Sequence, residues 1–150
     1  MAFKFKFTSL MKYRKRLEDA AQREYLLARR NLDDCLMLIQ QYYESMEKAR
    51  QEIGIHQISG DSGALNQILT LEHFIDGQKI RVTNERTRAR ELMAKVEEKQ
   101  ELLIEATREH KKLEKLEERM REVYRKDEKR REAKQVDDLV VIRSRRRAIV

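Results

Sequence analysis

A repeating pattern of apolar residues dominates residues 64–134 and limits what the chain can fold into. The apolar side chains recur at alternating steps of three and four, and the segment has no proline and a single glycine, Gly77. Proline removes a helical hydrogen bond and clashes with the preceding turn, so its absence favours one long helix. A period of 3.5 residues sustained over many heptads is typical of a coiled coil. The apolar series is Ile68, Leu71, Ile75, Val82, Ala89, Leu92, Val96, Leu103, Ala106 and Leu113.

The first sixty residues carry a second series that predicts the packing partner of this helix. Its members are Leu10, Tyr13, Leu17, Ala21, Tyr25, Ala28, Leu32, Cys35, Ile39, Tyr42, Met46, Ala49 and Ile53. Two successive steps of four, between Leu17 and Tyr25, predict a local stutter in the supercoil. Thr8 or Ser9 is a plausible N-cap. The breakers Gly60 and Gly63 lie between the two series and supply the backbone freedom that a reversal needs.

The two series predict an all-α fold, a long antiparallel two-helix coiled-coil hairpin in a single domain over residues 1–150. Helix one is expected at about 10–58, the turn at about 59–63 and helix two at about 64–143. Because helix two is longer, its residues beyond Arg119 should overhang, or be met only by an N-terminal lead in which Phe3, Phe5 and Phe7 alternate with lysines. We expect these phenylalanines to pack on helix two; the alternative is an aromatic handle for a partner.

Polar residues interrupt the series of helix two at Gln78, Glu85, Lys99 and His110. Polar seam positions reduce stability and can fix register, and four of them predict local looseness. After Leu113 the apolar series shifts phase to Leu116, Met120 and Val123, which predicts local overwinding.

Composition and charge restrict the class of protein. The mean hydropathy is −0.84, 41% of residues are charged, and residues 111–150 carry fifteen Lys/Arg against nine Asp/Glu. One cysteine fits a reducing compartment, and neither a membrane span nor a signal peptide is evident, so we expect a soluble cytoplasmic protein. No phosphate loop, metal-ligand spacing or nucleophile motif is found, so we expect no enzyme, no metal and no cofactor.

The arginines from Arg143 to Arg147 could in principle bind nucleic acid. The basic region of a leucine-zipper protein precedes its zipper, however, whereas these arginines come last and acidic residues interleave the helix before them. We therefore expect no nucleic-acid partner and interpret the basic end as a solvated or protein-docking face. A membrane-surface helix is also disfavoured, because a wide apolar face with Trp or Phe is lacking.

Two stretches of sequence resemble one family. The opening FKFKFTSLMKYRKRLEDAAQREYLLARRNL and the later HKKLEKLEERMREVYRKDEKRREAKQVDD, which ends at Asp137 and Asp138, are similar to FliJ, the coiled-coil component of the flagellar type III export apparatus. The resemblance covers nearly the whole chain. It implies a non-enzymatic stalk that inserts the end with both termini into the hexameric ring of the export ATPase, promotes its assembly, and contacts the membrane export gate and export chaperones. It also implies a location in the cytoplasm, peripheral at the cytoplasmic face of the inner membrane.

The resemblance suggests a few contact residues. Phe74 is the expected export-gate contact, because the family's pattern of an aromatic residue followed by x-x-Phe-Ile is kept here at Phe74 and Ile75, although Leu71 replaces the aromatic residue. Gln78 and Arg81 stand where such family members are apolar, which weakens the match. The expected ATPase-ring contacts are Arg14, Arg121, Arg125 and Arg130.

Three alternatives stay open at this point. One is a holdase-type chaperone that binds unfolded clients, and another is a structural homo-oligomeric coiled coil. The third is the equivalent stalk of a virulence type III secretion system. A hairpin whose two helices pair within one chain should be a monomer in solution, which separates it from the homo-oligomer.

Overall fold

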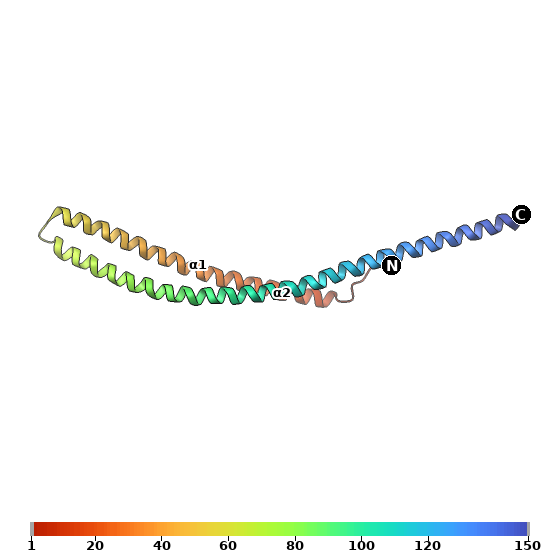
Figure 1. Ribbon diagram of the computed structural model, residues 1–150, viewed down its shortest axis with the longest axis horizontal. Helices are drawn as coiled ribbons and strands as arrows, with labels where there is room; N and C mark the ends of the chain where they lie inside the picture. Colours follow the sequence, from red (N-terminus) through yellow and green to blue (C-terminus); the bar gives the residue numbers. More distant parts are fainter. Residues whose placement is uncertain (1, 150) are drawn as a thin grey trace. The chain divides into compact units, whose positions relative to one another are not determined.

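A computed structural model describes residues 2–149 of the chain, and in them it contains two helices and no strand (Figure 1). Helix α1 covers Thr8–Ser59 and helix α2 covers Ala64–Ile149. The prediction of an all-α helical hairpin is confirmed. Helix α2 continues past the expected end near residue 143. The contacts divide the chain into unit 1, Met1–Asp19 with Glu105–Val150, and unit 2, Ala20–Ile104, which are described in turn.

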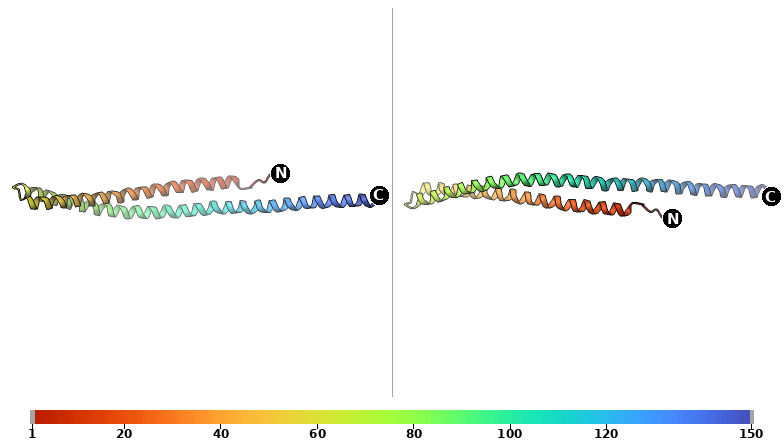
Figure 2. Two further views of the ribbon diagram at one scale, coloured as in Figure 1. Left: turned by 90° about the horizontal axis from the view of Figure 1, so that it is seen from above. Right: turned by 90° about the horizontal axis from the view of Figure 1, so that it is seen from below.

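Unit 2 holds the apolar part of the seam between α1 and α2. The two helices lie side by side through this unit in Figures 1 and 2. One buried cluster contains Cys35, Ile39, Val82 and Ala89, and a second contains Met46, Ala49 and Ile75. All seven residues belong to the two apolar series read from the sequence. Burial of each large apolar side chain stabilises the hairpin by about 1.5–3 kcal/mol.

The loop between the helices reverses the chain within four residues. Gly60 has φ of 60°, in the left-handed region that favours glycine, and its amide donates to the carbonyl of His56 at 3.3 Å. This is the single-bond αL termination of a helix. The amide of Ala64 donates to the backbone carbonyl of Asp61 at 2.9 Å, so backbone groups close the turn before α2.

The three polar residues that interrupt the seam of α2 in unit 2 each meet a polar partner on α1. Gln78 Nε2 donates to Ser45 Oγ at 2.9 Å, and Lys99 Nζ lies 3.0 Å from Glu24 Oε2. Glu85 Oε2 accepts from Cys35 Sγ at 3.3 Å. The seam is therefore paired rather than loose at these positions. Because a slip of one turn would separate all three pairs, they specify the antiparallel register.

Cys35 should behave as an inert thiol in the folded protein. It is 3% exposed, and burial raises the pKa of its thiol, with the hydrogen bond to Glu85 acting in the same direction. The thiolate is the reactive form, so both effects slow its reaction. We expect 5,5′-dithiobis(2-nitrobenzoate) to label Cys35 at least about tenfold more slowly in buffer than in denaturant. Equal rates in the two solvents would contradict the packing described.

Unit 1 keeps the 3.5-residue period on α1 but places polar side chains on the inner face. Leu10, Tyr13 and Leu17 are 41%, 54% and 38% exposed, so their assignment to the seam was wrong. The partly buried positions Met11, Arg14 and Glu18 lie on the inner face instead, and they lead into Ala21, a predicted seam residue at the start of unit 2 that is partly buried as expected. These continue the alternating steps of three and four without a break, and the predicted stutter is also wrong. The prediction assumed an apolar inner face, whereas two of the inner positions here, Arg14 and Glu18, are charged.

On α2 in unit 1, two of the predicted seam positions are likewise not on the inner face. Leu116 and Val123 are exposed, whereas the partly buried positions are Leu113, Glu117, Met120 and Tyr124. The predicted phase shift after Leu113 is therefore wrong, since these positions keep the heptad spacing.

The N-terminal lead, residues 2–7, packs on α2 within unit 1. The Phe3 ring lies 5.6 Å from the ring of Tyr124, and Phe5 is buried beside Phe7, with 5.8 Å between ring centroids. The expected packing of the phenylalanines on the second helix is thereby observed for Phe3. Thr8 does not act as the predicted N-cap acceptor: its hydroxyl donates to the carbonyl of Phe5 at 2.8 Å.

Candidate functional surfaces

A polar lock lies on the inner face of unit 1, formed by Glu18 from α1 and Thr107, His110 and Glu114 from α2. His110 Nδ1 is 2.8 Å from Glu18 Oε2, and Thr107 Oγ1 donates to Glu18 Oε1 at 3.4 Å. His110 Nε2 lies 3.6 Å from Glu114 Oε1. Glu18 Oε2 is fully buried, so a proton on His110 Nδ1 is needed to satisfy it. The lock joins the two helices and offers no nucleophile or open cleft for catalysis.

The N-terminal lead forms an aromatic contact with α2 immediately beyond this lock. The Arg121 guanidinium lies 5.5 Å from the centroid of the Phe3 ring, within the range of a cation–π contact. Arg121 also pairs with Glu117 at 2.8 Å. The Tyr124 hydroxyl donates to Glu128 Oε1 at 2.8 Å, and this bond, with desolvation, raises the pKa of Tyr124. The contact extends the two-stranded part of unit 1 to Tyr124.

Unit 1 places the four arginines expected at the ATPase ring in different settings. Arg14 is partly buried on the inner face of α1. Arg121 lies against the Phe3 ring of the N-terminal lead, yet its side chain is 51% exposed. Arg125 is exposed, and Arg130 is exposed with Asp127 3.9 Å away. Arg121, Arg125 and Arg130 are therefore accessible without movement of a neighbouring segment, whereas Arg14 is partly covered.

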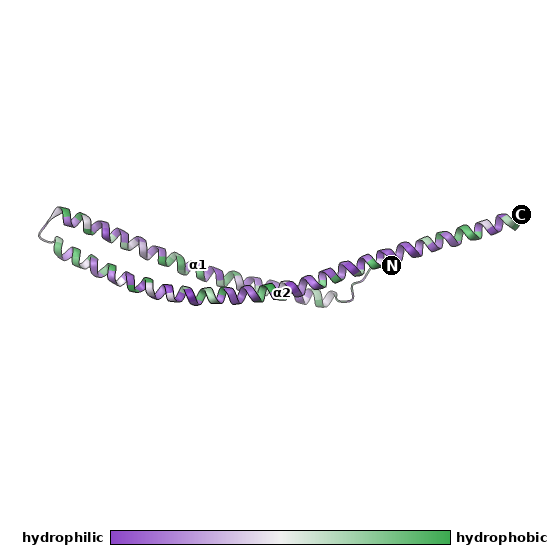
Figure 3. Ribbon diagram, in the orientation of Figure 1, coloured by the Kyte–Doolittle hydropathy of each residue, from purple (hydrophilic) through white to green (hydrophobic). Residues whose placement is uncertain are grey.

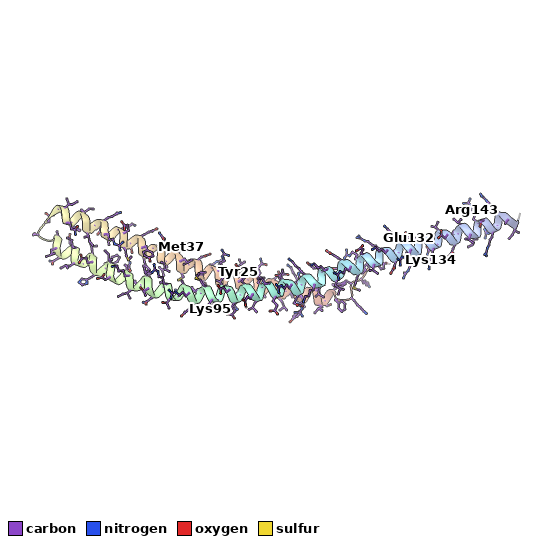
Figure 4. The ribbon with its side chains drawn as sticks, in the orientation of Figure 1. Tyr25, Met37, Lys95, Glu132, Lys134 and Arg143 are labelled. Atoms are coloured by element: carbon purple, nitrogen blue, oxygen red, sulfur yellow. The ribbon has the colours of Figure 1, made fainter. Side chains whose placement is uncertain are left out.

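The last part of α2, residues 129–149, has every side chain exposed. We call it the bare segment. It contains eight Lys/Arg against three Asp/Glu, a net charge of +5. Figure 3 shows it largely hydrophilic with a short apolar stretch toward its end, and Figure 4 labels Glu132, Lys134 and Arg143 along it. The bare segment joins strong positive charge to exposed apolar side chains, namely Val136, Leu139, Val140, Val141, Ile142 and Ile149.

The expected gate contact, Phe74, lies in unit 2 near the loop. Its side chain is 42% exposed, while its neighbour Ile75 is buried in the seam. The helix thus presents Phe74 to solvent beside the seam, where a partner can reach it. Gln78, one turn further, points inward and bonds Ser45, so it adds nothing to that exposed surface.

The sequence pattern missed Glu18 as a partner of His110. A signal was available, because stepping back from Tyr25 by four, three, four and three reaches Ala21, Glu18, Arg14 and Met11. The prediction missed this spacing because it followed the apolar residues Leu10 and Leu17.

Comparison with known families agrees with this architecture. The family model described as flagellar FliJ protein matches residues 3–148, nearly the whole chain. The chain belongs to the FliJ family. No curated protein and no solved structure matches it.

Membership of the FliJ family makes the chain a component of flagellar type III protein export, a structural one in a family not known for enzymes. The exposed end of α2 and the polar lock are thus features of an export component. Within residues 2–149, neither helix is long and apolar enough to cross a membrane, and no group of acidic, histidine and cysteine side chains is arranged to hold a metal ion.

Proposed function

We propose that this FliJ-family chain is a non-enzymatic stalk of the flagellar export apparatus, whose end carrying both termini enters the ring of the export ATPase. The observation that carries the proposal is the bare segment. It presents a net charge of +5 with no α1 residue paired along it. A single helix is about 10–12 Å wide with its side chains, which suits entry into the opening of a ring.

Charge gives this segment a means of finding its site. A strongly basic helix is steered toward an acidic surface, which raises the association rate without demanding tight packing. Arg121, Arg125 and Arg130 are exposed, and of the four expected ring contacts these are the three that we propose first. Arg14, which is partly buried, would join them only if the inner face rearranged.

The second proposed contact lies in unit 2. Phe74, half-exposed beside the seam, is the proposed contact with the membrane export gate. A stalk that joins the ATPase to the gate would lie in the cytoplasm, peripheral at the inner membrane, and export chaperones are its further proposed partners. The chain itself is proposed to be a monomer, because the apolar seam of unit 2 is already filled within one chain.

The test is the turnover of a purified flagellar export ATPase, measured as phosphate release with and without this protein, alongside light scattering of this protein alone. Stimulated turnover and a monomeric mass would support the stalk. We expect the stimulation to weaken as salt rises above about 0.15 M, because salt screens exposed charges. Unchanged turnover with a dimeric mass would contradict the stalk and favour a structural coiled coil.

A further inference from the structure

One edge of the coiled coil in unit 2 carries arginines that are bonded to tyrosines. Arg29 Nη1 donates to the Tyr25 hydroxyl at 3.1 Å on α1. Arg86 of α2 donates to the hydroxyl of Tyr43 on α1, and its guanidinium lies 5.7 Å from the centroid of that ring. A tyrosine hydroxyl orients a guanidinium but leaves its positive charge unneutralised.

The register of the hairpin places apolar side chains between these arginines. Arg86 on α2 faces Tyr43 on α1. Met93 lies one heptad after Arg86, and Leu36 lies one heptad before Tyr43, so both are on the side of this pair toward Arg29. Leu36 is 46% and Met93 is 51% exposed. We call these residues the tyrosine–arginine face: Arg29, Leu36, Tyr43, Arg86 and Met93. Figure 4 shows side chains projecting from this part of α1, where Tyr25 and Met37 are labelled.

The positive charge of this face is only partly balanced by nearby carboxylates. Among residues 2–149, neither Arg86 nor Arg90, one turn further along α2, lies within ion-pair distance of a carboxylate. Within the same range Arg29 also forms no ion pair, although the carboxylate of Asp33 attracts it and helps to raise its pKa. Off this face, Arg88 pairs with Glu85 at 3.5 Å and Lys99 with Glu24 at 3.0 Å, whereas Lys95 forms no ion pair in the described part of the chain. The face therefore combines exposed apolar side chains with guanidinium groups that form no ion pair with any described residue.

We propose that the tyrosine–arginine face docks an acidic amphipathic helix of a partner protein. The exposed Leu36 and Met93 would meet the apolar stripe of that helix, and carboxylates flanking the stripe would receive the guanidinium groups of Arg29 and Arg86. Guanidinium binds carboxylate in a planar, two-bond geometry, and a tyrosine that already orients it lowers the ordering cost. From Arg29 to Tyr43 the face extends about 21 Å, the length of four helical turns.

A second copy of this chain fits the face poorly. Two-fold pairing would bring this patch against itself, so Arg86 and Arg29 of one copy would oppose the same positive residues of the other. The inference does not rest on the proposed ATPase contact, which lies in unit 1. It also differs in position from Phe74, because Phe74 shares its edge of α2 with Lys95, three heptads along the chain, and not with Arg86.

The experiment uses the full chain and a fluorescent 21-residue helical peptide with leucines at heptad positions a and d and glutamates beside them. A second peptide carries lysines in place of the glutamates. Fluorescence anisotropy should show binding of the acidic peptide only. Arg86→Glu should weaken that binding by about tenfold or more, because it replaces an attraction with a repulsion, and Leu36→Asn by about five- to tenfold.

Matched variants on the opposite edge provide the controls. Lys95→Glu makes the same charge change as Arg86→Glu, and Leu102→Asn removes an apolar side chain that is 45% exposed, similar to Leu36. Both should bind the acidic peptide within about twofold of the unaltered chain, and circular dichroism should show all four variants equally helical. Equal binding of the two peptides, no binding of either, or equal loss in Lys95→Glu would overturn the proposal. So would a dimer in light scattering that Leu36→Asn dissociates, since the face would then be an interface between copies.

Discussion

Removal of residues 129–150 should abolish stimulation of the export ATPase while leaving the rest of the chain folded. The bare segment is exposed throughout, so the seam of unit 2, the polar lock and the contact of Phe3 with Tyr124 would all remain. The truncation also removes five of the chain's seven net positive charges. If electrostatic steering and insertion both depend on this segment, stimulation should fall to the level of the ATPase alone.

The cut belongs after Glu128 because the structure shows how far the N-terminal lead reaches. Phe3 contacts Tyr124, whose hydroxyl bonds Glu128, so a cut after Arg119 would also remove the packing partners of the lead. If the chain cut after Arg119 lost activity, the cause could be either the missing bare segment or the unpacked N-terminal lead. With the cut after Glu128, the thermal midpoint of the remaining hairpin should change by no more than about 2 °C.

A charge variant of the full-length chain tests whether stimulation of the ATPase depends on the charge of the bare segment or on its length. Glutamates in place of Arg143, Arg145, Arg146 and Arg147 keep the helix long but reverse its sign, and should reduce stimulation as strongly as the cut. The matched control is Lys95→Glu in unit 2, which should stimulate normally. Full stimulation by the truncated chain would place the ATPase contact outside the bare segment, whatever the tyrosine–arginine face binds.

The sequence predicted the hairpin because unit 2 follows its apolar pattern closely. Cys35, Ile39, Val82 and Ala89 are apolar, recur at heptad spacing and are buried, so hydropathy alone identifies the inner face. The basic end of α2 was also readable, since net charge and the unequal helix lengths need no knowledge of packing. These features are local or periodic, and a single sequence records both.

The inner face of unit 1 was not readable from hydropathy. Leu17 and Val123 are apolar but exposed, while Arg14 and Glu18 are charged and partly buried. A polar residue is stable on an inner face only if the opposite helix supplies its partner, and that depends on the register across the hairpin. The partners of Gln78, Lys99 and His110 were missed for this reason, and so were the tyrosines that bond Arg29 and Arg86. Single-helix patterns contain no information on which residues face each other.

His110→Ala should destabilise unit 1 because it removes the imidazole nitrogen that lies 2.8 Å from the buried Oε2 of Glu18 and is positioned to satisfy it. His110 and Glu18 side chains are 11% and 18% exposed, and their contact distance is 2.8 Å. Leaving one buried polar group unsatisfied costs about 1–3 kcal/mol, and loss of the imidazole packing adds to this. The expected fall in the thermal midpoint is about 2–4 °C for each kcal/mol.

A double substitution tests whether the pair, rather than the volume of the imidazole, is responsible. Glu18→Leu with His110→Leu removes both polar groups, and replacing both partners with apolar groups is often neutral or stabilising. The double variant should therefore be more stable than either single leucine variant. Amide hydrogen exchange should locate the effect: protection should fall for residues 8–19 and 105–124 in His110→Ala and stay unchanged around Cys35 and Val82. Unchanged protection in unit 1, or a double variant weaker than both single variants, would show that the polar lock does not hold the two helices together there.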